Sequence, residues 1–478
     1  MNHHTHARRL PPPVGLGIVI AVLALVLGYP SGLLAPQRVQ AGVVAQPATG
    51  AATGTWSGSI VIQNNGTEVA NAVVNFYSTA GVLVKSYPLP TAIPPKGSAV
   101  VDTDAIVDLP NGFAGSAIIS AAQPVSAIYL AFDSGNPAIG RGIYAGMSTG
   151  TTKVYVPAIS HNYADQTSVL AVQNVDAGPV SVTIRYYDRF TGALTATVSA
   201  NIPPGASQYF DASQLPGPQQ LPPPWSGAAV VEASGRITAA VHQPYLSANK
   251  VVNFEATASA GTEVYLPSAL FQYAPQQQTS FIAVQNTQAT PVTATVSFYD
   301  RAGNPVGQVG GTIDGFRKLS WNPGSAGLPS GYSGVAVVRA SGPVVAIVNI
   351  GSATDLALAY TGQPLGSLRV ALPYVRWAPP TDPKGWRTYI AIMNVDQNAA
   401  ADLTLRYYDT NGTLVHTQAI TGVVPYAKGN HHPGLVVGTG GTFVGSVEVE
   451  STRPVVAVVN AITADETLAE SFTGIPIP

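Results

Sequence analysis

The stretch Ser168–Tyr187, which reads SVLAVQNVDAGPVSVTIRYY, decides the fold because the chain repeats it. Copies of its pattern follow at Ser280–Tyr299 and Thr388–Tyr408, and a looser copy precedes it at Gly58–Tyr77. The copies recur at a spacing of about 110 residues, which is typical of a chain built from repeated structural units. The sequence therefore predicts four copies of one unit.

The second half of each copy alternates between apolar and polar residues. In the second copy the apolar side carries Val180, Val182, Ile184 and Tyr186. Such alternation of β-branched and aromatic residues predicts a β-strand with one buried face. We expect Tyr186, Phe298 and Tyr407 to be buried, and their neighbours Tyr187, Tyr299 and Tyr408 to point away from the core.

Further strand and turn signals fill the rest of each unit. A turn such as Asp188–Gly192 follows the alternating strand, and a break such as Ile202-Pro-Pro-Gly205 comes after the next one. Each unit then has an aromatic residue, one spacer and a glycine, as in Trp225-Ser-Gly227 and Tyr332-Ser-Gly334. We expect Trp225 and Tyr332 to pack in the cores of their own units. Seven or eight short strands in roughly 100 residues indicate an immunoglobulin-like β-sandwich.

The chain resembles the tandem immunoglobulin-like domains of exported bacterial surface proteins, including the cell-adhesion-related type. The resemblance is carried by Val172-Gln-Asn174, Tyr186-Tyr187-Asp188 and Ile202-Pro-Pro-Gly-Ala-Ser207. Repeat 3 departs from it, because Ile313-Asp-Gly-Phe316 stands where a Pro-Gly turn is expected. The resemblance implies a module of surface architecture, and a fold of this kind carries no activity by itself.

The predicted fold class is all-β, with four tandem immunoglobulin-like β-sandwich domains after an N-terminal signal or anchor helix. The predicted segments are a signal peptide or membrane anchor (1–41), a linker (42–53) and repeats 1 to 4 (54–149, 150–259, 260–365 and 366–478). The joints between repeats are only a few residues long. Short joints favour a rod of domains joined end to end.

The N-terminus has the pattern of a secretory signal. Arg8 and Arg9 precede the apolar run Val14–Gly28, and Val39-Gln-Ala41 offers small residues for cleavage. Counting on to Ala35 reaches the length of about 20 apolar residues that a membrane helix needs, so an uncleaved anchor stays open as the alternative. Both interpretations predict a secreted or cell-surface protein, and the chain touches the membrane only if this segment stays uncleaved.

Composition excludes several kinds of function. The chain has no cysteine, which excludes disulfides and thiolate chemistry. Charged residues make up 10% of the chain, against about 25% in an average soluble domain. The net charge is −2 and there is no cluster of basic residues, so nucleic acid is not an expected partner. Little charge opposes self-association, which leaves copies of the chain itself or cell-envelope polymers as the expected partners.

No catalytic, cofactor-binding or metal-binding motif is evident in the sequence. There is no Gly-x-Ser-x-Gly and no His-Glu-x-x-His. We therefore expect no enzyme activity, no cofactor and no metal. The enzyme hypothesis would gain support if His161, Asp165 and a hydroxyl converged in one pocket.

One repeated feature is a candidate for ligand or interdomain contact. Tyr163, Tyr273 and Trp377 occupy corresponding positions in the loop after the opening strand of repeats 2, 3 and 4. Buried aromatic residues can fill a joint with the preceding unit, and exposed ones can stack on sugar rings. We favour the first interpretation and keep the second as its alternative.

The sequence leads to two main hypotheses of function. The first is a non-enzymatic, exported structural or adhesive cell-surface protein, acting as a spacer, coat or docking module. The alternative is a carbohydrate-binding protein that uses the repeated loop aromatics on cell-wall polysaccharide. Retention on polysaccharide separates the two, because a pure spacer is not retained.

Overall fold

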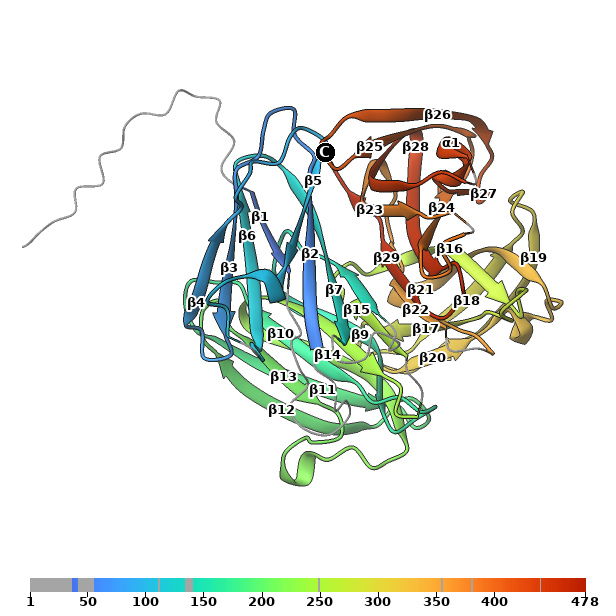
Figure 1. Cartoon of the computed structure of the whole chain (residues 1–478). Coiled ribbons are helices and arrows are strands. Elements are labelled where there is room, and N and C mark those ends of the chain that lie inside the picture. The colour runs from blue at the N-terminus through green and yellow to red at the C-terminus, as the bar shows by residue number, and fades with distance from the viewer. Residues whose placement is uncertain are drawn as a thin grey trace, which may run out of the picture. The chain divides into compact units, whose positions relative to one another are not determined.

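The computed structural model describes residues 37–41, 56–110, 112–133, 141–247, 250–353, 356–379, 381–438 and 440–478. These residues belong to one compact unit, Pro36–Pro478. The predicted leader helix and the linker 42–53 lie outside the described residues. The described part is all-β, with strands arranged in antiparallel sheets (Figure 1).

The strands fall into four sets that follow the sequence repeats. Repeat 1 has β1 (Gln37–Ala41), β2 (Trp56–Asn64), β3 (Ala72–Ser78), β4 (Leu83–Pro88), β5 (Ser98–Asp102), β6 (Gly115–Ala121), β7 (Val125–Asp133) and β8 (Gly142–Ala145). Repeat 2 has β9 (Thr151–His161), β10 (Val169–Asn174), β11 (Val180–Asp188), β12 (Leu194–Ile202), β13 (Ser207–Asp211), β14 (Trp225–Pro244) and β15 (Val251–Glu255).

Repeats 3 and 4 continue the same series. Repeat 3 has β16 (Gly261–Phe271), β17 (Thr279–Asn286), β18 (Val292–Tyr299), β19 (Pro305–Ile313), β20 (Lys318–Trp321), β21 (Tyr332–Gly351) and β22 (Ala357–Thr361). Repeat 4 has β23 (Ser367–Trp377), β24 (Trp386–Asn394), β25 (Ala401–Asp409), β26 (Leu414–Val423), β27 (Lys428–His431), β28 (Phe443–Thr463), β29 (Ala469–Thr473) and β30 (Ile475–Pro476).

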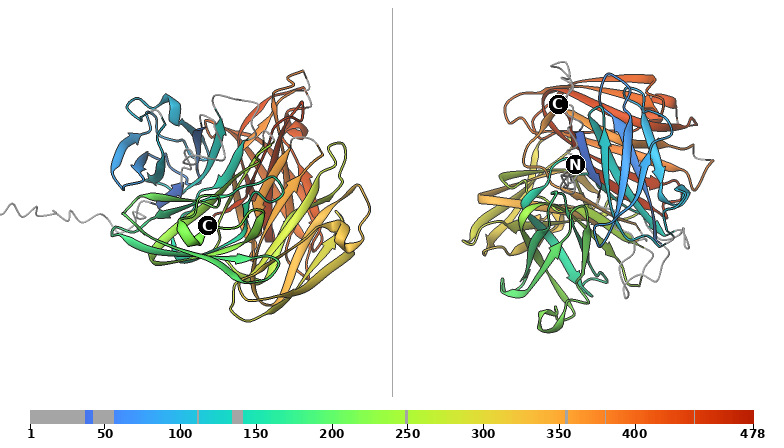
Figure 2. Two further views of the ribbon diagram at one scale, coloured as in Figure 1. Left: turned by 90° about the horizontal axis from the view of Figure 1, so that it is seen from below. Right: turned by 90° about the vertical axis from the view of Figure 1, so that its left-hand side faces the viewer.

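In repeats 2, 3 and 4, one long strand joins two groups of strands into a single hydrogen-bonded sheet. The first half of β14 pairs with β9 and β11, and its second half pairs with β10 and β15. Repeat 1 divides this strand into β6 and β7, and its two sheets have the orders β1-β6-β3-β4 and β5-β2-β7-β8. The strand β1 thus occupies the edge that β9 occupies in repeat 2, although it lies inside the segment 1–41 assigned to the leader. Figure 2 shows these sheets from two further directions.

The alternation predicted for the third strand of each repeat is confirmed. Tyr186, Phe298 and Tyr407 are 1%, 0% and 0% exposed. Tyr299 lies in a cluster separate from the core of its own repeat, as an outward-pointing residue would. The register is therefore the predicted one, and the outward tyrosines are covered by other parts of the chain.

The aromatic-x-Gly step packs an aromatic ring edge-on against the third strand. Trp225 is buried, as predicted, with its ring centroid 6.3 Å from that of Tyr186. Tyr332 is only half-buried and lies 6.2 Å from Phe298 at the border of its core. A Cβ on Gly227 would lie 2.1 Å from the Tyr187 carbonyl oxygen, so only glycine permits this close approach.

The recurring asparagine of the Gln-Asn pair ties two loops together. The buried Asn174 donates from Nδ2 to the carbonyl oxygens of Gly178 and Ile202, each at 2.8 Å. Its Oδ1 accepts from the backbone N–H of Asp176. The same pattern recurs at Asn64, Asn286 and Asn394. This motif is therefore a structural element of each repeat, because it satisfies backbone groups that turns leave unpaired.

The turn held by this asparagine takes one conformation in all four repeats. Its central residue has positive φ at Lys96 (64°), Gly205 (73°), Phe316 (59°) and Tyr426 (60°). Repeat 3 therefore keeps the turn without the Pro-Gly sequence. Positive φ is uncommon for residues other than glycine, and the surrounding bonds hold it here.

Each of these turns contacts the preceding repeat at a joint. At joint 1/2, the Ser116 hydroxyl donates to the Gly205 carbonyl oxygen of the turn. At joint 2/3, Arg317 Nε donates to the Arg189 carbonyl oxygen at 2.8 Å. At joint 3/4, the Lys428 N–H donates to the Arg301 carbonyl oxygen at 3.1 Å. These bonds show that the predicted short joints are reinforced by contacts outside the linker.

The series of joints closes, because repeat 4 contacts repeat 1. At joint 4/1, the Ser98 N–H donates to the Thr410 carbonyl oxygen at 3.0 Å. The strands β8, β15, β22 and β29, which come near the end of each repeat, contact one another in turn. This arrangement differs from the end-to-end rod that short linkers favoured, since the first and last repeats of a rod do not meet.

Helix is almost absent from the described residues, as expected. They contain the single turn α1 (Gly434–Val437) and the 3₁₀ turns η1 (Thr103–Ala105), η2 (Gly217–Gln219) and η3 (Pro323–Ala326). Within the described ranges, no helix has the length and apolar character needed to cross a membrane.

Candidate functional site

Tyr163 and Tyr273 have the same surroundings in repeats 2 and 3. Both are half-buried, and each lies over an arginine from the turn after the third strand of its own repeat. The guanidinium of Arg189 is 5.6 Å from the Tyr163 ring centroid, and that of Arg301 is 5.7 Å from the Tyr273 ring. Both arginines also donate to the tyrosine hydroxyl, at 3.2 and 2.9 Å. The two tyrosines are thus fixed in equivalent positions.

Trp377, the third predicted site residue, lies differently. Its side chain is 7% exposed and stacks on His432 with ring centroids 4.6 Å apart. Tyr389 and Arg387 complete its described ring contacts, and all of these residues belong to repeat 4. Trp377 therefore does not present an open face equivalent to that of the two tyrosines.

The two tyrosines each line a cleft with the following repeat. Cleft A has a volume of about 490 Å³ and lies between repeats 2 and 3. Cleft B has a volume of about 430 Å³ and lies between repeats 3 and 4. The residues that occupy equivalent places are Tyr163, Arg189, Phe281, Lys318 and Asn349 in cleft A, and Tyr273, Arg301, Tyr389, Lys428 and Asn460 in cleft B.

An aromatic residue from the following repeat supplies the opposite wall. Phe281 on β17 is 48% exposed and Tyr389 on β24 is 38% exposed. Neither residue was predicted from the sequence as part of a site. The signal was available, because the corresponding positions in repeats 1 and 2 hold Ser59 and Val169.

A buried lysine lies in each cleft. Lys318 begins β20 and Lys428 begins β27, and their exposed fractions are 4% and 7%. Burial, with a smaller contribution from the nearby Arg189, lowers the pKa of Lys318 to about 7. Burial and Arg301 likewise lower the pKa of Lys428 to about 7. Repeats 1 and 2 have Ser98 and Ser207 at this position.

The cations of the clefts lack acidic partners. Across the described ranges, no ion pair or hydrogen bond joins Arg189, Arg301, Lys318 or Lys428 to a carboxylate. The nearby Asp188 and Asp300 accept hydrogen bonds within their own turns. The lining residues of cleft A include no carboxylate, and those of cleft B include only the exposed Glu466.

Cleft A also contains buried amide groups with no hydrogen-bond partner. These are the Nε2 and Oε1 atoms of Gln243, which is 0% exposed, and the Oδ1 atom of Asn349. A buried polar group without a partner costs free energy unless a ligand or water satisfies it. In cleft B, Gln278 Nε2 and His432 Nδ1 are in the same condition.

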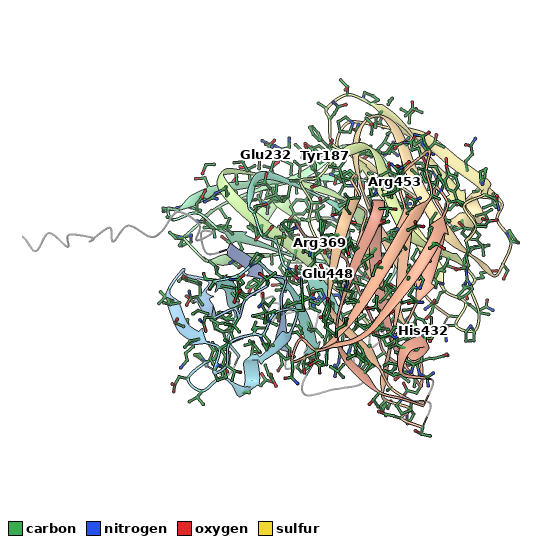
Figure 3. The ribbon with its side chains drawn as sticks, turned by 90° about the horizontal axis from the view of Figure 1, so that it is seen from above. Tyr187, Glu232, Arg369, His432, Glu448 and Arg453 are labelled. Carbon is green, nitrogen blue, oxygen red and sulfur yellow. The ribbon has the colours of Figure 1, made fainter. Side chains whose placement is uncertain are left out.

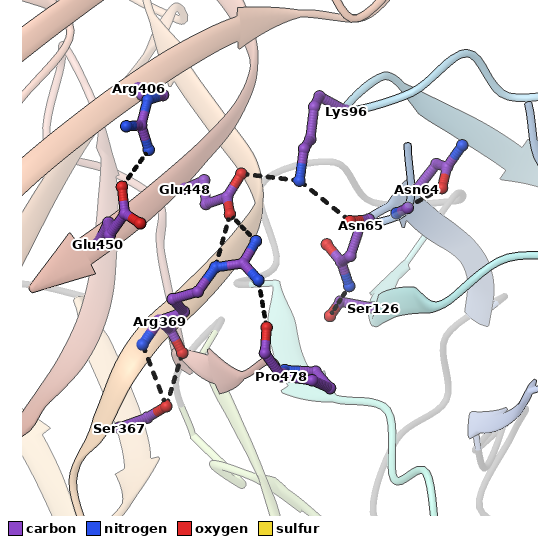
Figure 4. Close-up of polar contacts among 11 residues, drawn as sticks. Asn64, Asn65, Lys96, Ser126, Ser367, Arg369, Arg406, Glu448, Glu450 and Pro478 are labelled. Atoms are coloured by element: carbon purple, nitrogen blue, oxygen red, sulfur yellow. Dashed lines mark hydrogen bonds and ion pairs between the residues drawn. The ribbon is translucent and has the colours of Figure 1, made fainter. Parts of the chain in front are cut away.

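Joint 4/1 has the same kind of turn as the joints at clefts A and B, but its charged side chains are arranged differently. Here Lys96 Nζ lies 3.0 Å from Glu448 Oε2, and Arg369 binds the other oxygen of this carboxylate (Figure 4). Figure 3 shows Arg369 and Glu448 side by side. Burial opposes ionisation of Glu448, but hydrogen bonds from Arg369 and Lys96 outweigh it and lower the pKa of this carboxyl. Both cations at this joint therefore have a carboxylate partner.

The residues named for the enzyme hypothesis bind to different partners in the described contacts. His161 Nδ1 is 2.6 Å from the Leu221 carbonyl oxygen, whereas Asp165 accepts from the hydroxyl of Ser247. Over the ranges that the structure describes, no group of three or more His, Cys, Asp or Glu residues could hold a metal ion.

Comparisons with known proteins add little. No protein-family model matches the chain, and no curated protein matches it. The crystal structure of the Thermotoga maritima protein 1070 is similar to 22% of this chain and 95% of its own, with 14% identity and a TM-score of 0.20. A glycoside hydrolase family 32 structure from Bifidobacterium adolescentis covers 92% of this chain and 96% of its own, with 10% identity and a TM-score of 0.16. At these TM-scores neither likeness bears on the fold or the clefts.

Proposed function

We propose that the chain is a non-enzymatic, exported cell-surface protein, a docking or adhesive module that holds cell-envelope polysaccharide in clefts A and B. Its four repeats are immunoglobulin-like β-sandwiches of the kind found in exported bacterial surface proteins. The basic and apolar N-terminal pattern supports export. Contacts between repeats 1 and 4 favour a compact coat or docking module over an extended spacer.

The observation that carries the proposal is the repetition of one cleft. Tyr163 with Phe281, and Tyr273 with Tyr389, place two partly exposed rings on the walls of each cleft. Aromatic faces pack against the C–H faces of sugar rings, and amide groups suit their hydroxyls. Two equivalent sites can engage one polymer together, which strengthens weak single contacts.

The test is retention of the exported chain on immobilised cell-envelope polysaccharide. Phe281→Ala together with Tyr389→Ala removes the more exposed wall of each cleft with little effect on the cores, and we expect retention to fall strongly. Tyr163→Ala together with Tyr273→Ala gives the same result from the opposite wall. Tyr87→Ala is the matched control, since Tyr87 is a half-buried tyrosine on β4, outside both clefts.

Unchanged retention of both double variants would contradict the proposal. It would favour a structural role in which copies of the chain are the partners. Thermal unfolding of each variant, measured alongside, separates loss of binding from loss of fold.

A further inference from the structure

Both clefts have the charge pattern of an anion site. A lysine and an arginine from adjacent repeats lie in each cleft, and Coulomb repulsion from the arginine is part of what lowers the lysine pKa. Placing two cations together in a partly buried space is unfavourable unless an anion neutralises them. The chain supplies such an anion at joint 4/1, where Glu448 lies beside Lys96 and Arg369. It supplies none to Lys318 or Lys428 among the described residues.

The residue types at these equivalent positions change together from one joint to another. Arginine is present at 189 and 301, in the repeats that precede clefts A and B, and lysine is present at 318 and 428, in the repeats that follow. The corresponding residues at the other two joints are Thr79 with Ser207, and Thr410 with Ser98. Phe281 and Tyr389 follow the same division. The cations and the aromatic wall thus form one set of residues, and it is present at two joints of the four.

The geometry points to a ligand with both a ring and a negative charge. Resting on the proposed function, we propose that clefts A and B each bind the anionic group of an acidic saccharide, with Lys318 and Arg189, or Lys428 and Arg301, facing its carboxylate or phosphate. The free amide of Gln243 and the Oδ1 atom of Asn349 then meet sugar hydroxyls in cleft A. Tyr163 and Phe281 contact the ring.

The experiment compares polygalacturonate with its fully methylated ester, which has the same backbone without charge. Binding of the full exported chain is measured at mildly acidic pH, where the cleft lysines are protonated. We expect the acid form to bind more tightly, and Lys318→Met with Lys428→Met to reduce its affinity by roughly tenfold or more, since hydrogen bonds to charged groups carry most of such recognition. The double variant is expected to bind the ester as the unmodified chain does.

Controls keep the result interpretable. Lys153→Met removes a lysine of repeat 2 that is paired with Glu232 outside the clefts, and it is expected to leave the preference for the acid form unchanged. Arg189→Gln with Arg301→Gln changes less buried residues and is expected to lower the same preference. Glucuronate and glucose 6-phosphate, used as small competitors beside glucose, distinguish a carboxylate ligand from a phosphate ligand.

Equal binding of the acid and the ester, with both lost in Phe281→Ala plus Tyr389→Ala, would overturn the anionic ligand and leave the proposed function intact. Competition by inorganic phosphate as effective as that by glucose 6-phosphate would also overturn it, because the clefts would then bind bare anions. Failure to bind any of the polymers would contradict both proposals.

Discussion

Cleft A and the ion-pair network of joint 4/1 lie at different places of joints that share one kind of turn, and they treat charge in opposite ways. At joint 4/1 the cations Lys96 and Arg369 share Glu448, and the carboxylate is 4% exposed. In cleft A the cations Arg189 and Lys318 face a hollow with no carboxylate among its lining residues. A buried charge with a partner holds a joint together, whereas one without a partner costs stability.

This difference separates structural residues from candidate functional ones. Some features recur in every repeat, such as the hydrogen bonds of Asn174 to two loops and the glycine at Gly227. These features have a structural explanation in the bonds and close contacts that they make. Lys318 and Phe281, in contrast, have counterparts in repeat 4 alone, at Lys428 and Tyr389, and these line cleft B. Residues that lower the stability of a protein are typical of binding sites, where a ligand offsets the cost.

The largest expected effect on stability comes from removing the buried lysine of cleft A. Lys318→Met replaces the ammonium group with an apolar side chain of similar length, and we expect the free energy of unfolding to rise by about 1–4 kcal/mol at neutral pH. Denaturant unfolding of the variant and of the unmodified chain measures this difference in free energy. Lys153→Met, which breaks the pair with Glu232 instead, is the control and is expected to give no gain. A loss of stability in Lys318→Met would show that Lys318 has a partner and that the two joints are alike.

The increase in the free energy of unfolding of Lys318→Met should depend on pH in a defined direction. The pKa of Lys318 is about 7 in the folded chain and 10.5 in its ordinary state, so between these values the unfolded chain binds more protons. The stability of the unmodified chain therefore rises with pH across this window, and the advantage of Lys318→Met is largest below pH 7 and disappears above about 10.5.

The opposite effect is expected at joint 4/1. Glu448→Gln keeps the shape of the side chain but leaves Lys96 and Arg369 without their counter-charge, and we expect the free energy of unfolding to fall by about 1–3 kcal/mol. Because the folded pKa of Glu448 is lowered, the unmodified chain should lose this stabilisation as pH falls below the ordinary glutamate range, while the variant does not.

The matched control for this change is Glu450→Gln. Glu450 lies two residues further along β28 and is more exposed than Glu448. It pairs with Arg406 at 2.7 Å, and Figure 4 marks this contact. Exposed pairs contribute about 0–1 kcal/mol, so this variant should change stability little. Equal losses in the two variants would contradict the role assigned to joint 4/1.

Periodic patterns in the sequence were sufficient to predict the strands. The alternation around Tyr186 predicted its burial because one face of a strand must pack on a core. The same pattern showed that Tyr187 faces outward, but not that Phe316 of the next repeat covers it, with ring centroids 5.2 Å apart. Contacts between repeats depend on how complete units meet, and period-two alternation carries no information about that.

The candidate site was predictable in part. Tyr163 and Tyr273 were found because they recur in a loop, and both line a cleft. Lys318 and Lys428 were not, because a lysine at the start of a short strand normally lies in solvent. A comparison of aligned positions across the repeats, Ser98, Ser207, Lys318 and Lys428, would have marked them.

The smallest expected effect concerns His242, which takes at joint 1/2 the place that Asn349 has in cleft A. His242 is buried, with Nδ1 2.9 Å from Asn253 Oδ1, and burial lowers its pKa to about 4. The unfolded chain binds the proton near pH 6.5, so the unmodified protein should lose about 1 kcal/mol over the first pH unit below that value. His242→Asn restores the residue of repeats 3 and 4 and removes this loss.

His431, whose pKa is also lowered to about 4, titrates in both proteins, so the difference between their pH profiles isolates His242. Parallel profiles would mean that His242 keeps its proton in the folded chain, and that joint 1/2, like cleft A, contains a buried cation.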